Sequence, residues 1–323
     1  MYSTSLLIFT LLLTLASPAP APSATASYTL IDNCSGASFL SCFDFFSSAD
    51  PTHGFVHYLN QADAQAQNLF TITDDTVKIS VDSTNITPDG RASVRLQSKK
   101  LYNRGLFVLD LVHMPASTCG SWPSFWTLGS AKPWPENGEI DIIEAVNTDT
   151  TNHMTLHTSD GCSITGAGGQ GRVVTQNCFV GAAGQPANAG CGVESASAAS
   201  FGSPVNAAGG GVYAMEWTAE RIAVWFFPRG SVMGDLVAGT PDPSTWGPPD
   251  ASFQGDCDLS THFVDHSLLI DTTFCGDWAG SVWSSNPICS ALAPTCADYV
   301  ANNPAAFAES YWQINSLKIF SQW

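Results

Sequence analysis

Short runs of β-branched or alternating apolar residues, separated by Gly, Pro, Asn and Asp, recur along most of this chain. Such runs are typical of β-strands joined by turns, and no long segment repeats its apolar residues about every 3.6 positions, as an amphipathic helix does. We therefore expect an all-β fold, a sandwich of two sheets. The expected strands are residues 77–81, 94–99, 106–114, 139–144, 153–158, 212–217, 222–227, 268–274 and 311–320.

The segments between these runs indicate how the chain is organised. Residues 218–221 separate two strand-like runs and are expected to turn a hairpin. Residues 159–211 are rich in Gly, Ala and Ser and lack periodicity, so we expect loops there. Because neither a repeat nor a Ser/Thr-rich linker divides the chain, the sequence favours one domain over residues 27–323.

The first 26 residues are typical of a secretory signal peptide. Their apolar run, residues 6–15, is shorter than the roughly 20 residues that a membrane-spanning helix needs. The small residues at 24–26 match the pattern that precedes signal-peptide cleavage. We therefore expect residues 1–26 to be removed and the protein to be secreted and extracellular.

All ten cysteines follow this segment. An even number of cysteines in a secreted chain predicts up to five disulfides, whose pairing the sequence leaves open. A zinc site is not favoured, because the chain contains no C-x-x-C pair. Asn33 and Asn85 each begin an N-glycosylation sequon.

The charge balance excludes several classes of partner. The chain has 28 acidic and 11 basic residues, a net charge of −17. Nucleic acids and anionic membranes are bound by clustered cations, so we expect neither as a partner. A neutral polysaccharide can approach such a surface without repulsion.

Glu139–Glu144, with the sequence EIDIIE, is the most informative stretch, because three acids lie within a strand otherwise made of Ile. Side chains alternate along a strand, so Glu139 and Asp141 share a face and Glu144 has the opposite parity. One extra residue, a β-bulge near Ile142 and Ile143, brings Glu144 to the same face. The sequence therefore predicts three carboxylates on one face, with Ile side chains filling the core behind them.

Three close carboxylates repel one another, so at least one must keep its proton near neutral pH. Glycoside hydrolysis uses such a pair, one carboxylate ionised and one carboxyl protonated. Asp141, between the two glutamates, could hydrogen-bond Glu139 and orient it. Two other interpretations remain open: an edge strand whose charges discourage aggregation, and a calcium site, which takes about 6–8 oxygen ligands.

Histidines and tryptophans surround the acids in the sequence. His153 and His157 share a face of the next strand, and a register with Glu144 opposite His153 places Glu139 opposite His157. Trp122, Trp126 and Trp134 precede the acids and offer flat faces for sugar rings. Structural roles are open for all of these, because a lone His is commonly a structural hydrogen-bonder and a Trp commonly lies in the core.

The acid motif resembles the signature of glycoside hydrolase family 16, in the bulged ExDxxE form of laminarinase-like members. The resemblance covers nearly the whole mature chain, which is similar in these segments to fungal secreted endo-1,3(4)-β-glucanases. Its supporting segments are residues 106–115, 121–126, 153–162, 213–229, 274–280 and 311–320. Ser124 departs from the Ala that is more usual in the family.

The resemblance implies a concanavalin-like β-sandwich, or β-jelly roll, with a concave substrate cleft. It implies that Glu139 is the nucleophile, Glu144 the acid/base, Asp141 an assistant to the nucleophile and His157 a neighbour of the site. It also places glucose rings against four tryptophans: Trp126, Trp134, Trp217 and Trp278. We expect no cofactor and assign no residue to a metal, and whether structural calcium is bound is left open by the sequence.

We therefore expect a monomeric endo-acting β-glucanase that cuts internal 1,3 bonds, and 1,4 bonds of mixed-linkage glucans, with retention of configuration. A cell-wall glucan transglycosylase and a non-catalytic β-glucan lectin remain alternatives, because a fold alone does not define its activity. The intact trio of acids favours an enzyme over a lectin. The linkage preference is not fixed by the sequence.

Overall fold

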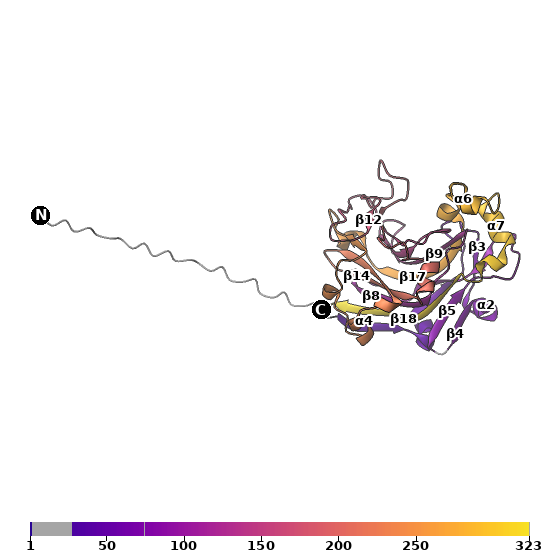
Figure 1. Ribbon diagram of the computed structural model, residues 1–323, viewed down its shortest axis with the longest axis horizontal. Helices are drawn as coiled ribbons and strands as arrows, with labels where there is room; N and C mark the ends of the chain where they lie inside the picture. The colour runs from indigo at the N-terminus through magenta and orange to yellow at the C-terminus, as the bar shows by residue number, and fades with distance from the viewer. Residues whose placement is uncertain (2–27, 74, 323) are drawn as a thin grey trace.

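The computed structural model describes Met1, residues 28–73 and residues 75–322. Apart from Met1, the signal peptide predicted over residues 1–26 lies outside the described residues. The described chain forms two eight-stranded sheets and a small two-stranded one, which confirms the predicted all-β sandwich (Figure 1). Each strand expected from the sequence is present.

The first sheet is antiparallel, and β1 (Tyr28–Cys34) pairs with one of its inner strands, β18. Its order across the sheet is β16 (Ala251–Phe253), β15 (Ile222–Pro228), β14 (Gly211–Trp217), β8 (Gly105–His113), β18 (Tyr311–Gln322), β5 (Thr76–Ser80) and β4 (Phe70–Thr73). The hairpin expected around residues 218–221 joins β14 to β15.

The second sheet is also antiparallel and holds the acid motif in an inner strand, β10. Its order is β12 (Arg172–Val173), β13 (Cys191–Glu194), β11 (His153–His157), β10 (Glu139–Glu144), β9 (Ser121–Gly129), β17 (His266–Phe274), β7 (Arg95–Ser98) and β2 (Phe43–Phe46). The small sheet pairs β3 (Val56–Tyr58) with β6 (Arg91–Ser93). An inner position for β10 argues against the edge-strand interpretation of its charges.

The helices are short. They are α1 (Phe39–Cys42), α2 (Gln61–Ala66), α3 (Ser203–Ala207), α4 (Gly234–Ala238), α5 (Leu259–His262), α6 (Pro287–Ser290) and α7 (Cys296–Asn302). Within the described residues, no helix has the length and apolar character needed to cross a membrane.

The main core lies between the two large sheets. Alternate residues of β8, such as Phe107 and Leu109, face alternate residues of the second sheet, such as Phe125, Ile140 and Ile270, and all are buried. Each large side chain buried in this way stabilises the fold by about 1.5–3 kcal/mol relative to exposure. The opposite face of the second sheet is thereby left for polar residues.

Strand β9 is a strand that the sequence pattern does not predict. Pro123 lies within it, and proline is usually confined to edge strands because it lacks an N–H donor. In the structure Pro123 pairs only on the side of β17, opposite Thr272, and the ladder to β10 begins one residue later at Ser124. The missing donor therefore does not interrupt the pairing with β10.

The ten cysteines form five disulfides, as the sequence predicts. Two of them, Cys162–Cys257 and Cys178–Cys191, anchor the loop-rich segment 159–211. Two others, Cys119–Cys289 and Cys275–Cys296, fasten the α6–α7 region to the ends of the second sheet. This region forms a small apolar cluster of its own around Trp283 and Phe307.

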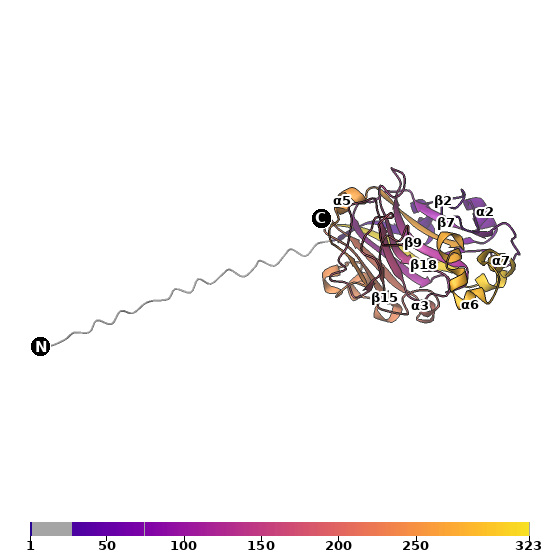
Figure 2. The ribbon, with the colours of Figure 1, turned by 90° about the horizontal axis from the view of Figure 1, so that it is seen from above.

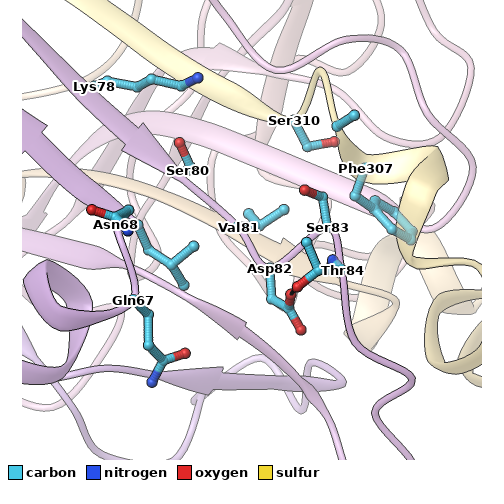
Figure 3. A pocket seen from close by; sticks show the side chains of 12 residues that line it. Gln67, Asn68, Lys78, Ser80, Val81, Asp82, Ser83, Thr84, Phe307 and Ser310 are labelled. Carbon is cyan, nitrogen blue, oxygen red and sulfur yellow. Dashed lines mark hydrogen bonds between the residues drawn. The ribbon is translucent and has the colours of Figure 1, made fainter.

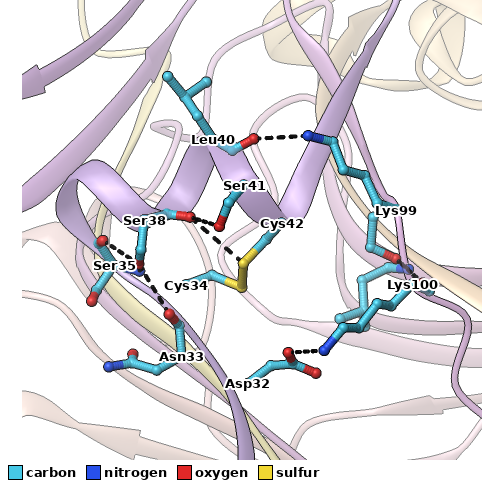
Figure 4. The surroundings of a disulfide bond; sticks show 12 residues. Asp32, Asn33, Cys34, Ser35, Ser38, Leu40, Ser41, Cys42, Lys99 and Lys100 are labelled. Carbon is cyan, nitrogen blue, oxygen red and sulfur yellow. Dashed lines mark hydrogen bonds and ion pairs between the residues drawn. A yellow bond between two sulfur atoms is a disulfide. The ribbon is translucent and has the colours of Figure 1, made fainter.

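The fifth disulfide, Cys34–Cys42, joins the end of β1 to the end of α1, just before β2 (Figure 4). Beside it, the Lys99 ammonium donates to the backbone carbonyl of Leu40 at 3.1 Å, and Lys100 pairs with Asp32. These contacts attach the first strand of the domain to the segment that follows β7.

The two ribbon views place the segments that border the acid strand. The β12 region and the α6–α7 region lie on opposite sides, with β9 and β17 between them (Figure 1), and the second view also shows α6 and α7 to one side of β9 (Figure 2). Loops of both regions therefore flank the polar face of the second sheet, which we call the active face.

Candidate active site

A β-bulge in β10 brings the acids to the active face. Asp141 pairs with Trp126 of β9 and Ile143 pairs with Phe125, so Ile142 is the extra residue. The bulge predicted near Ile142 and Ile143 is confirmed. Beyond it, Glu144 pairs with Ser124, whose side chain lies on the same face as that of Trp126. The three Ile side chains of β10 are fully buried on the core side.

Gly138 sets the start of this strand. Its φ of +79° lies in the left-handed region, where a side chain is strained. A Cβ at this position would also lie 2.4 Å from the carbonyl oxygen of His262. Glycine is therefore required for the chain to enter β10 at the angle that presents Glu139.

Pairing across the second sheet aligns further polar residues with the acids. One cross-strand row runs from β2 to β10 and ends at Glu144: Phe46, Arg95, Asp271, Ser124 and Glu144. The neighbouring row ends at Asp141: Asp44, Gln97, Leu269, Trp126 and Asp141. The active face is thus lined by polar and aromatic side chains across five strands.

Glu144 is held by two donors from β9. The Trp122 indole Nε1–H donates to Glu144 Oε1 at 2.7 Å, and the Ser124 hydroxyl donates to the same oxygen at 3.4 Å. Trp122 in turn packs edge-on against Trp278, with ring centroids 5.8 Å apart. Because both hydrogen bonds reach Oε1, the orientation of the Glu144 carboxyl group is fixed.

Glu139 has a different set of partners. The indole Nε1–H of Trp134 donates to Glu139 Oε2 at 2.9 Å. His157 lies directly opposite Glu139 in the β10–β11 ladder, as predicted, and its Nε2 is 4.0 Å from Glu139 Oε1 and 3.1 Å from Asp141 Oδ2. An imidazole therefore bridges the first two acids of the motif.

The other half of the predicted register is wrong. The β10–β11 ladder ends at Asp141 and Thr155, so Glu144 does not pair with His153. His153 instead packs edge-on against Trp278, with centroids 5.8 Å apart. The bulge explains the difference, because it lifts the end of β10 out of the ladder.

The three acids share a poorly solvated site. Burial, and next to it the charge of Asp141, raises the pKa of Glu139 and of Glu144 to about 8. Burial, followed by the charge of Asp271, raises the pKa of Asp141 to about 8. Near neutral pH the cluster therefore retains protons, as the sequence predicted for closely spaced carboxylates.

Asp271 and Arg95 are site residues that the sequence analysis did not select, and Trp122, considered there as a face for sugar rings, instead binds Glu144. Asp271 is buried on β17, and Arg95 Nη1 is 3.6 Å from its carboxylate. Burial raises the pKa of Asp271 to about 7 although Arg95 opposes the shift. The sequence signal for Asp271 was an acid inside the strand-like run LLIDTTF. No feature of the sequence indicated that Trp122 would donate a hydrogen bond to Glu144.

The four predicted sugar-binding tryptophans occupy different environments. Trp134 lies in the loop before β10 and is 43% exposed, and Trp126 and Trp278 are half-buried. Trp126 lies in the row of Asp141, with the Arg95 guanidinium 4.9 Å from its ring centroid. These three border the acids.

The prediction that Trp217 lines the cleft is wrong. Trp217 is 1% exposed, and its ring packs against Phe263 and His266 in the core. The reason is strand parity, since Trp217 alternates with Tyr213 and Met215 on the face of β14 that points between the sheets.

Three side chains of the cluster also have the spacing of metal ligands. One atom each of Glu139, Asp141 and His157 lies within 4.8 Å of the other two. The same spacing allows them to share a proton, and Glu139 already accepts a hydrogen bond from Trp134. We therefore interpret the group as a proton-sharing cluster.

Two pockets lie outside the acid cluster. One, of about 420 Å³, is lined by Asp44, Gln97, Ser130 and Ser267, among others, and continues the active face toward β2. The other, of about 210 Å³, lies between β5 and the turn that precedes β18 (Figure 3). Its lining includes Lys78, Asp82 and Ser310 and no residue of the second sheet, so it is separate from the acid cluster.

Fold and site together define a two-sheet β-sandwich protein in which a bulged inner strand gathers three acids on one face of the second sheet. Comparison with known proteins then gives the family. The model of the XgeA-like catalytic GH16 domain matches residues 43–320. The chain therefore belongs to glycoside hydrolase family 16.

Among curated relatives, an endo-1,3(4)-β-glucanase from Arthroderma benhamiae is 47% identical over 302 residues, which cover 92% of this chain and 66% of that protein. An endo-1,3(4)-β-glucanase from Emericella nidulans is 44% identical, covering 92% of this chain and 48% of the relative. The chain thus spans about half to two thirds of the length of these relatives.

Two solved structures share the β-jelly-roll architecture over their whole length. Laminarinase 16A from Phanerochaete chrysosporium, with 6-O-glucosyl-laminaritriose in donor and acceptor sites, superimposes with a TM-score of 0.86 at 43% identity and covers 92% of this chain. An elongating family 16 β-1,3-glucosyltransferase gives a TM-score of 0.85 at 44% identity and covers 91%.

Proposed function

We propose that the protein is a secreted, endo-acting β-glucanase that hydrolyses internal 1,3 bonds, and 1,4 bonds of mixed-linkage glucans, with retention of configuration. The observation that carries this proposal is the bulge, because it brings Glu139 and Glu144 to one face with different hydrogen-bond partners. Relatives named endo-1,3(4)-β-glucanases support the substrate class.

In the proposed mechanism Glu139 attacks the anomeric carbon while Glu144 donates its proton to the departing glycosidic oxygen. The C1–O bond breaks and a glycosyl ester forms on Glu139. Glu144, now ionised, takes a proton from water, which attacks C1 and releases Glu139. Retaining enzymes of this type place the two carboxyl groups about 5–5.5 Å apart.

Each active-face group has a part in this scheme. His157, positioned beside Glu139 and Asp141, favours the ionised form of the nucleophile. Asp141 assists the nucleophile from the same face. Trp126, Trp134 and Trp278 offer aromatic faces to glucose rings, and the pocket near β2 extends the face for a longer chain.

The first test is the pair Glu139→Gln and Glu144→Gln, assayed on laminarin, lichenan and curdlan with sizing of the products. We expect each variant to lose activity by about 10³-fold or more, because a general acid or a nucleophile is removed. Near-full activity in either folded variant would reject the assignment, and an α-anomer as the first product by NMR would reject retention.

One observation favours a second candidate function. The structural relative described as an elongating β-1,3-glucosyltransferase shows that this scaffold accommodates transfer to a sugar hydroxyl in place of water. Incubation with laminari-oligosaccharide acceptors would then give products longer than the substrate. If the protein were a non-catalytic β-glucan lectin, it would bind the glucan and release no new reducing ends.

A further inference from the structure

The bulge leaves two backbone groups of β10 without partners in the neighbouring ladder. The pairing of β10 with β11 ends at Asp141 and Thr155, before the Ile142 carbonyl and the Glu144 N–H. Both groups are instead bound by one side chain, that of Asn152. Its Oδ1 accepts from the Glu144 N–H at 2.9 Å, and its Nδ2 donates to the Ile142 carbonyl at 2.8 Å.

Asn152 is itself immobilised. It immediately precedes β11, is 1% exposed, and its backbone N–H donates to the Ser200 hydroxyl at 2.9 Å. Its carbonyl accepts from the Ser195 N–H at 2.9 Å, and the Ser200 hydroxyl donates to the carbonyl of Ser197 at 2.7 Å. The loop 195–200 therefore fixes the backbone of Asn152, from which the amide that binds the bulge projects.

We propose that Asn152 is the positioning residue for the acid/base Glu144, an inference that rests on the proposed function. The amide does not touch the substrate; it fixes the backbone from which Glu144 projects. A shift of one residue in a strand moves a side chain to the opposite face, so a stable bulge is a condition for Glu144 to face the substrate.

The energetic reason is the cost of burying unpaired backbone groups. Loss of the amide leaves the Ile142 carbonyl and the Glu144 N–H without these partners, and a buried group that makes no hydrogen bond is destabilising. The end of β10 can relieve this cost only by moving, and a displacement of about 1 Å at a catalytic group can lower the rate roughly 100-fold.

The test separates misplacement of the acid from general damage by using two substrates. Laminarin needs a proton from Glu144 at the glycosidic oxygen. In 2,4-dinitrophenyl β-laminaribioside the C1–O bond breaks as Glu139 attacks, and dinitrophenolate leaves with the electron pair and needs no proton. Added azide then attacks C1, displaces Glu139 and forms the β-glycosyl azide without a general base.

We expect Asn152→Ala to lower laminarin hydrolysis about 100-fold, through kcat rather than KM, while the aryl substrate with azide reacts within about threefold of the wild-type rate. Asn152→Asp keeps the shape and the acceptor for the Glu144 N–H, so it serves if the alanine variant does not fold. It loses the donor to Ile142, and we expect the same split at about tenfold.

Asn206→Ala is the matched control. Its amide binds the N–H and carbonyl of Met114 at 2.9 and 2.8 Å, away from the acid strand. We expect the ratio of this variant's rate to the wild-type rate to be the same for laminarin and for the aryl substrate. Equal losses on the two substrates in the Asn152 variants, or unchanged laminarin hydrolysis, would overturn the proposal.

Glu144→Gln, measured beside them, distinguishes the two levels of inference. It should show the same split in a stronger form. If it hydrolyses laminarin normally, the catalytic assignment itself is wrong. If it is inactive and the Asn152 variants are not impaired, only the positioning role of Asn152 is wrong.

Discussion

Glu144 on β10 and Glu216 on β14 are both glutamates on inner strands, one in each large sheet. The charged groups beside them have opposite signs. Glu216 is 7% exposed, and Arg221 Nη2 donates to it at 2.8 Å while the Tyr28 hydroxyl donates at 2.7 Å. The charge that most affects the pKa of Glu144 is that of Asp141, and the side chains that donate to its carboxylate are the neutral Trp122 and Ser124.

The two large sheets treat buried acids differently. In the first sheet a buried acid is neutralised by a guanidinium across the β14–β15 hairpin, as structural acids are. In the second sheet three acids are gathered and their pKa values raised, which costs stability and is typical of catalytic sites.

The largest expected effect concerns the tryptophans of the two sheets. Trp217→Ala should destabilise the protein by about 3–5 kcal/mol, because it leaves a large cavity between the sheets. Trp134→Ala should change stability by less than about 0.5 kcal/mol, because Trp134 is an exposed loop residue outside the core between the sheets. Its kcat/KM on laminarin should fall roughly tenfold, a cost of about 1.4 kcal/mol. Chemical denaturation and steady-state kinetics measure both; a stable Trp217→Ala variant would place that ring outside the core.

The next effect breaks the neutral pair of the first sheet. Arg221→Ala leaves Glu216 buried without its cation and should destabilise the protein by about 2 kcal/mol at pH 7. Laminarin hydrolysis at a temperature where the variant is folded should be unchanged. The double variant with Glu216→Gln serves as the control, and it should recover most of the lost stability. Reduced kcat in the folded single variant would mean that the two sheets are coupled.

In the second sheet we expect a substitution to raise the free energy of unfolding, by a smaller amount. The folded-state pKa of Glu144 is about 8, whereas an unfolded glutamate titrates near about 4.3. Between these values the folded state binds more protons than the unfolded state, so this group lowers stability as the pH rises from about 4 to about 8. Glu144→Gln removes the ionisation and should stabilise the protein by about 1–2 kcal/mol at pH 8 and by nearly zero at pH 4.

Thermal unfolding of the wild type and Glu144→Gln across this pH range measures the difference. Glu216→Gln is the matched control in the first sheet and should not be stabilised at any pH, because it loses one of two acceptor oxygens and the charge that pairs with Arg221. A Glu144→Gln variant that is less stable than the wild type at pH 8 would show that the carboxylate is well solvated.

Parity and local chemistry made much of this architecture predictable. The strand runs, the bulge at Ile142 and the pairing of Glu139 with His157 follow from residue alternation in neighbouring strands. What the sequence could not supply depends on distant segments. Parity puts Trp217 on one face of β14 with Tyr213 and Met215, but the sequence does not show that this face packs against Phe263 in the core.

The same limit applies to the groups that position the acids. Trp122, Asn152 and Asp271 reach Glu144 or its neighbours from β9, from the loop before β11 and from β17. Pro123 hid the strand that carries Trp122, because proline usually argues against an inner strand. These contacts are properties of the assembled sheet and have no motif of their own.

The smallest expected effect separates the roles of the two glutamates within the active face. A hydrogen bond to a carboxylate favours its ionised form and lowers its pKa. Trp122 donates to Glu144 and Trp134 donates to Glu139, so Trp122→Phe should raise the pKa of Glu144 and Trp134→Phe that of Glu139. Phe keeps an aromatic face at each position, which limits the change in sugar contact.

The direction of the shift in the pH–rate profile then identifies each role. An acid/base that must start protonated sets the alkaline limb of kcat/KM, and a nucleophile that must be ionised sets the acidic limb. Trp122→Phe should therefore move the alkaline limb upward by about half a pH unit and widen the profile. Trp134→Phe should move the acidic limb upward by a similar amount and narrow it. If Trp122→Phe instead moves the acidic limb and Trp134→Phe the alkaline limb, Glu139 is the acid and Glu144 the nucleophile. The contrast between the charge-paired acid of the first sheet and the clustered acids of the second would still hold.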